Sequence, residues 1–121
     1  MTVRRFEDLV AWQKARALAL EVYRVTGKGG FGRDLGLKDQ ARRAASSVMA
    51  NIAEGFERYS RREFQHFLGI ARGSAGELRS HLSLAAGLGF LDRDHFAALD
   101  AGCSEVSRLI AALRASHRAA D

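Results

Sequence analysis

Apolar residues recur at spacings of four and three through the stretch from Ser60 to Gly87. This period predicts one long amphipathic helix with an apolar seam facing a core. Ser60 and Glu63 have the spacing of a capping box, so we expect the helix to begin there. The seam consists of Phe64, Leu68, Ala71, Ala75, Leu78, Leu82 and Ala85.

The same stretch carries a second stripe, made of small residues, about 140° around the helix from the seam. Each glycine inside a helix costs about 1 kcal/mol relative to alanine. A regular glycine stripe therefore indicates a face on which another backbone packs closely; the alternative is a helix bent near Gly73 with no partner. We predict an oligomer contact there through Gly69, Gly73, Gly76 and Ser80.

Three further amphipathic segments predict helices over residues 7–26, 36–56 and 92–117. The segment between the first two holds Gly27, Gly29, Gly30, Gly32 and Gly36 and is expected to be a flexible loop, with Phe31 tucked into the bundle end. Four helices with short connections predict an all-α fold, an antiparallel up-and-down four-helix bundle forming a single domain over residues 1–121.

The face of the second helix opposite its apolar seam is also unusual, because it is small and nearly uncharged between Arg43 and Glu54. A helix face in contact with solvent normally carries more charged residues. We therefore predict a second oligomer contact that includes Ser46, Ser47, Ala50 and Glu54.

Charge and composition bear on partners and location. The chain has 121 residues, no proline, one cysteine and a net charge of +5, and only three of its 19 cationic residues are lysine. Arginine binds phosphate bidentately, so RNA, DNA or an acidic protein is an expected partner; the alternative is that the charge only solubilises the bundle. Without an 18-residue apolar run or an apolar leader, we expect a cytoplasmic protein with no membrane contact. The predicted contact residues are Arg42, Arg43, Arg58, Arg61 and Arg62.

No pattern of residues predicts catalysis. Glu63 and His66 match half of a di-iron motif, but a second Glu-x-x-His is absent from the sequence. Cys103 lies on the apolar seam of the last helix, which favours a buried, inert thiol. We therefore predict no enzyme activity, catalytic residue, metal, cofactor or small-molecule substrate.

Several stretches resemble the four-helix-bundle proteins encoded in bacterial 23S rRNA intervening sequences. The most specific is Asn51-Ile52-Ala53-Glu54-Gly55, within the matching run 40–55. Further matching stretches are 6–15, 22–23, 63–74, 77–78 and 88–91. Relatives usually carry proline near Met49 and after the equivalent of Phe31, where this chain has Met49 and Gly32.

The resemblance implies an up-and-down bundle that assembles as a ring, typically a homopentamer, without known catalysis. A related basic bundle is the nucleic-acid- and polymerase-binding accessory protein of diversity-generating retroelements. On the family's motif positions, Arg43, Asn51 and Glu54 are the polar residues expected to serve assembly or binding. Our leading hypothesis is an oligomeric bundle that binds RNA or a nucleoprotein through arginines, and the alternative is a protein-interaction scaffold without a nucleic-acid role.

Overall fold

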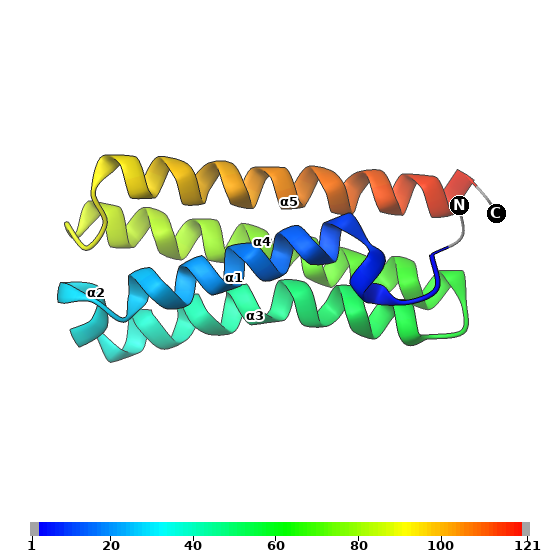
Figure 1. The fold of residues 1–121 in the computed structure, drawn as a ribbon, viewed down its shortest axis with the longest axis horizontal. Coiled ribbons are helices and arrows are strands. Elements are labelled where there is room, and N and C mark those ends of the chain that lie inside the picture. The colour runs from blue at the N-terminus through cyan, green and yellow to red at the C-terminus, as the bar shows by residue number, and fades with distance from the viewer. Residues whose placement is uncertain (1–2, 120–121) are drawn as a thin grey trace.

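The computed structural model describes residues 3–119, and side chains as far as Ser116. Figure 1 shows the long helices side by side along the longest axis, with the short helix at the end opposite the two termini. The all-helical prediction is confirmed for the described residues; the single-domain prediction over 1–121 extends beyond them. The elements are a 3-10 helix η1 (Phe6–Asp8) and the helices α1 (Val10–Thr26), α2 (Gly29–Arg33), α3 (Leu35–Glu57), α4 (Arg61–Gly87) and α5 (Arg93–Ala119).

The core lies between the four long helices. Helices α1 and α4 each pack against both α3 and α5, so every long helix contributes an apolar face. All seven residues of the predicted α4 seam are buried, and the most accessible, Phe64, is 6% exposed. Burying one such large apolar side chain contributes about 1.5–3 kcal/mol, so the seam is a main source of stability.

Side chains and glycine define the ends of the helices where the sequence indicates. The Ser60 hydroxyl accepts a hydrogen bond of 3.0 Å from the Glu63 amide, which confirms the predicted cap of α4. Asp92 accepts one of 2.7 Å from the His95 amide at the start of α5. Gly89 has a φ of +79°, the left-handed conformation that glycine adopts at little cost. Helices α4 and α5 therefore begin close to their predicted positions.

The predicted first helix is wrong at its start. Instead of one continuous helix from about residue 7, the chain forms η1, then Leu9 with extended backbone, then α1. This interruption lets Leu9 enter the core, where it is buried, and brings the Phe6 ring to 5.1 Å from the Trp12 ring. Burial of these apolar side chains explains why the two helical segments are offset.

The glycine-rich connection is also not the loop that we expected, because Gly29–Arg33 forms α2. As predicted, Phe31 is fully buried at the bundle end, and its ring centroid lies 5.9 Å from that of Phe90. A Cβ on Gly30 would lie 2.7 Å from two Phe90 ring carbons, so glycine at this position leaves room for the ring where it lies. Burial of Phe31 offsets the low helix propensity of the glycines.

None of the helices within residues 3–119 combines the length and the apolar character needed to cross a bilayer.

Candidate functional site

The outer face of α4 is accessible over the second half of the helix. We define this face as Gly73, Gly76, Ser80, Ser83, Leu84 and Gly87, all of which are exposed. A Cβ added at Gly73 or Gly76 would meet nothing within 4 Å, and Leu84 is 54% exposed. On this face the isolated chain therefore presents small uncharged residues and one exposed leucine, and the predicted oligomer contact stays a prediction.

Gly69 differs from the other glycines of the predicted stripe. A Cβ there would lie 3.4 Å from the guanidinium group of Arg114, which reaches over from α5. A second contact between α4 and α5 lies nearby, where the Gln65 side chain donates to the Arg114 carbonyl oxygen at 2.7 Å. Gly69 is thus covered by its own chain, in contrast to Gly73 and Gly76.

The residues predicted on α3 fall into two groups. Ser46, Ala50 and Glu54 are exposed, whereas Ser47 and Asn51 are half-buried. The half-buried pair uses its polar groups within the chain, because Asn51 donates to the Ser47 carbonyl oxygen at 2.8 Å and to its hydroxyl at 2.9 Å. The Ser47 hydroxyl also lies 2.8 Å from the Ser74 hydroxyl of α4, a partner that the sequence analysis missed. The predicted oligomer contact stays a prediction.

Arg42 is held by its own chain. Its Nε donates to the Thr26 hydroxyl at 2.8 Å, and its Nη2 donates to the Tyr23 carbonyl oxygen at 3.1 Å. The guanidinium carbon lies 4.5 Å from the centroid of the Tyr23 ring. Thr26 is fully buried and donates in turn to the Val22 carbonyl oxygen at 2.7 Å. Arg42 therefore joins α3 to the end of α1, which the sequence analysis did not foresee.

The remaining predicted arginines are more accessible. Arg43 pairs with Asp39 at 2.9 Å, and Arg58 pairs with Glu54 at 3.4 Å while lying 4.9 Å from the Phe67 ring centroid. Exposed ion pairs of this kind contribute only about 0–1 kcal/mol, so a phosphate can compete for these guanidinium groups.

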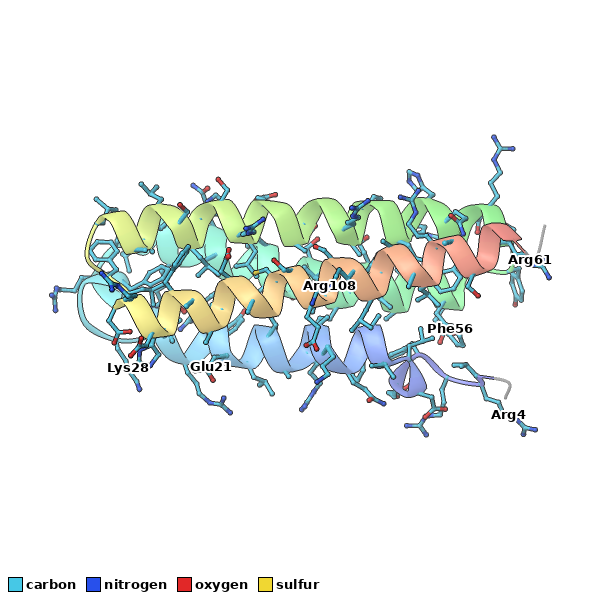
Figure 2. The ribbon with its side chains drawn as sticks, turned by 90° about the horizontal axis from the view of Figure 1, so that it is seen from above. Arg4, Glu21, Lys28, Phe56, Arg61 and Arg108 are labelled. Atoms are coloured by element: carbon cyan, nitrogen blue, oxygen red, sulfur yellow. The ribbon has the colours of Figure 1, made fainter. Side chains whose placement is uncertain are left out.

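Arg61 and Arg62 are exposed at the start of α4, next to the fully exposed ring of Tyr59. Figure 2 places Arg61 at the same end of the bundle as Arg4 and opposite Lys28. Glu54, Glu57 and Glu63 belong to the same turn region and are exposed as well. The local charge is therefore mixed in sign, and this end of the bundle is not uniformly basic.

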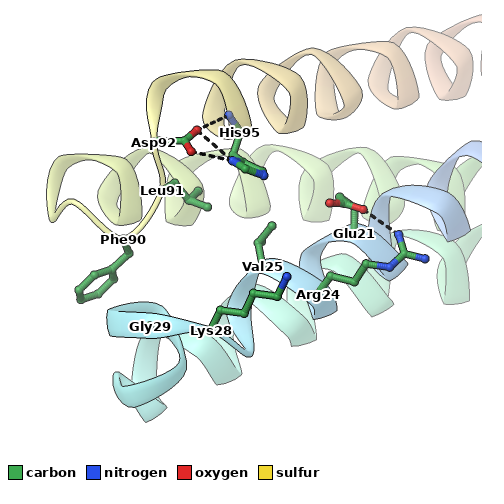
Figure 3. A pocket seen from close by; sticks show the side chains of 9 residues that line it. All are labelled: Glu21, Arg24, Val25, Lys28, Gly29, Phe90, Leu91, Asp92 and His95. Carbon is green, nitrogen blue, oxygen red and sulfur yellow. Dashed lines mark hydrogen bonds and ion pairs between the residues drawn. The ribbon is translucent and has the colours of Figure 1, made fainter.

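A cleft of about 310 Å³ lies at the opposite end, between α1, α2 and the start of α5 (Figure 3). Its charges are largely paired, with Arg24 at 2.7 Å from Glu21 and His95 at 2.9 Å from Asp92. The hydrogen bonds from His95, first from its amide and then from its ring, lower the pKa of Asp92. This pairing fits a cap at the start of α5, and of the described cations that line the cleft only Lys28 has no ion pair.

Chemistry that would support catalysis is weak in the described residues. Burial raises the pKa of the Cys103 thiol to about 11, so it stays protonated and unreactive near neutral pH. Glu77 and His81 form an exposed pair at 3.3 Å. Within residues 3–119 no cluster of three or more His, Cys, Asp and Glu side chains has the arrangement to hold a metal ion.

The model of one protein family, described as 23S rRNA-intervening sequence protein, matches residues 7–112. The chain belongs to this family. A protein of unknown function from Bacteroides thetaiotaomicron VPI-5482, of the S23 ribosomal protein family, has a similar solved structure, with a TM-score of 0.80 and 22% identity over 87% of this chain and 98% of that one. This similarity shows the fold alone. No curated protein matches the chain.

Membership in the 23S rRNA-intervening sequence protein family confirms the resemblance seen in the sequence. The matched residues run from η1 into α5 and include the Asn51–Gly55 signature and the whole outer face of α4. Both predicted contact surfaces therefore lie in the part of the chain that defines the family.

Proposed function

We propose that this family member is a non-enzymatic, oligomeric RNA-binding protein whose subunit is an antiparallel up-and-down four-helix bundle. The observation that carries the proposal is a net charge of +5 supplied mostly by arginine. Several of these arginines are exposed, and the ion pairs of Arg43 and Arg58 are weak enough for phosphate to replace. The family's description, which refers to a ribosomal RNA insertion, favours RNA over DNA.

Assembly into a homopentamer is the second part of the proposal. The outer face of α4 supports it, because Gly73 and Gly76 leave open space next to the exposed Leu84. Glycine costs helix stability, and close packing of another helix would offset that cost. An oligomer would also repeat the arginines around a ring, so that one RNA could contact several subunits at once.

Binding to a structured RNA across a series of salt concentrations tests the proposal. Phosphate contacts release counterions, so the logarithm of the binding constant should fall linearly with the logarithm of salt concentration. We expect binding at low salt and a clear negative slope. Absence of binding at low salt, or binding without a slope, would contradict an arginine–phosphate interface.

A protein-interaction scaffold is the alternative, and one observation favours it. Arg42, Arg43 and Arg58 already have partners in their own chain, which leaves fewer unpaired cations than the composition suggests. Purification with and without nuclease treatment separates the two functions: a stable protein partner retained after nuclease treatment supports the scaffold, and loss of the co-purifying material supports RNA binding.

A further inference from the structure

A shallow groove between α1 and α3 differs in character from the other hollows of the bundle. It has a volume of about 270 Å³ and is lined by Arg16, Ala19, Leu20, Tyr23, Ser46 and Met49. The aromatic and aliphatic side chains in it are accessible, since Leu20 is 42% and Tyr23 47% exposed. Among the residues that the structure describes, no carboxylate lines this groove, whereas Glu21 and Asp92 both line the cleft of Figure 3.

Arginine side chains flank the groove at both ends. At one end, the hydrogen bonds to Thr26 and to the Tyr23 carbonyl oxygen hold Arg42 over the Tyr23 ring. At the other end, Arg16 is exposed and has no ion-pair partner among the described residues. A second hollow lies nearer the start of α3 and is lined by Leu35, Gly36, Lys38, Asp39 and Arg42.

Resting on the proposed RNA-binding function, we propose that the α1–α3 groove binds one unpaired nucleobase of single-stranded RNA. The base packs against Tyr23 and Leu20, and a flanking phosphate contacts Arg16. Aromatic side chains beside cations are the usual platform for unpaired bases. The described lining residues include no carboxylate that would repel the phosphates of RNA. A duplex does not fit, because its bases are stacked inside the helix and only backbone and groove edges are accessible.

Fluorescence anisotropy with two labelled RNAs of equal length, one unstructured and one a hairpin duplex, tests the proposal. Tyr23→Ala should weaken binding of the unstructured RNA between about fivefold and 150-fold, the loss typical of one stacked base. The duplex affinity should change little. Tyr23→Phe, which keeps the ring, should bind like the wild type.

Arg16→Gln provides an independent readout. The Arg16 side chain that it replaces is exposed and makes no ion pair with described residues. Loss of one phosphate contact to single-stranded RNA should reduce the magnitude of the log–log salt slope by about 0.7. Tyr23→Ala should leave that slope unchanged, because stacking releases no counterion. The two variants thus separate the base contact from the phosphate contact.

The outcomes distinguish this proposal from the function on which it rests. If the wild type binds neither RNA at low salt, RNA binding itself fails and the groove proposal with it. If the wild type binds but Tyr23→Ala and Arg16→Gln bind equally well, the groove proposal is overturned and RNA binding stands. If Tyr23→Ala dissociates the oligomer without changing RNA affinity, a second copy of the chain occupies the groove, which also overturns the proposal.

Discussion

Gly55 closes the Asn-Ile-Ala-Glu-Gly signature at a point where α3 and α4 are in close contact, and its replacement by alanine should destabilise the fold. A Cβ there would lie 2.8 Å from the Cβ of Phe67, 3.0 Å from a ring carbon of Phe64 and 3.4 Å from the Phe64 carbonyl oxygen. Cβ and carbonyl atoms cannot swing away, so relief requires the helices to separate. Overpacking of this kind costs about 1–3 kcal/mol, partly offset by the gain of about 1 kcal/mol from replacing glycine in a helix.

Gly36→Ala is the matched control, because it makes the same change in the same helix. Its Cβ would meet only a carboxylate oxygen of Asp34, at an ordinary 3.8 Å. The control should therefore be neutral or more stable by up to about 1 kcal/mol. We expect the free energy of unfolding of Gly55→Ala to lie about 1–3 kcal/mol below that of Gly36→Ala, measured by urea denaturation at one fixed protein concentration. Equal stability of the two variants would refute the close contact at Gly55.

Three further predictions concern single contacts. Burial raises the pKa of Cys103 from 9.0 to about 11, so the folded chain holds this proton more tightly than the unfolded chain does. The thiol's contribution to stability is complete below pH 9 and is lost as pH rises toward 11, by about 1 kcal/mol at pH 10. Urea titrations at pH 8 and pH 10 should show this loss for the wild type, and Cys103→Ala should abolish it. Asp92→Ala should lower the melting temperature by more than Asp92→Asn does, because asparagine is also a good cap. The lowered pKa of Asp92 means that its charge-dependent contribution is present above the ordinary aspartate pKa and is lost as pH falls through the lowered value. Thermal melts should therefore show a larger loss of stability toward acid pH for the wild type than for Asp92→Asn. Thr26→Val should cost about 1–3 kcal/mol by leaving the Nε of Arg42 without its acceptor, and an unchanged melting temperature would show that water replaces it.

The long helices could be predicted because their signals are local. The apolar period of α4 and its Ser60 cap depend on residues close together in the sequence, and the structure places the helix at Arg61–Gly87 behind that cap. The short helix α2 gave no such signal, since glycine disfavours helix. It forms because Phe31 is buried against Phe90, a residue almost sixty positions away.

The candidate sites were less predictable because they depend on contacts between residues far apart in the sequence. The helical period indicates the direction of a side chain around its own helix, but not which neighbour lies beside it. Ser47 and Arg42 therefore seemed available for a partner, whereas they contact Ser74 and Thr26 of the same chain. Gly73 could be assigned to an outer face correctly, because the α4 seam defines the opposite side.

The central claim is that the outer face of α4 is covered by another copy of the chain. Sedimentation equilibrium of the wild type and of a Gly73→Ala, Gly76→Ala double variant tests it most directly. In the isolated chain both new methyl groups point into open space, so the subunit should gain about 2 kcal/mol of helix stability. We predict a wild-type mass of five 13.2-kDa chains and dissociation of the double variant to smaller species. A monomeric wild type at high concentration, or a double variant that assembles as tightly as the wild type, would contradict the claim.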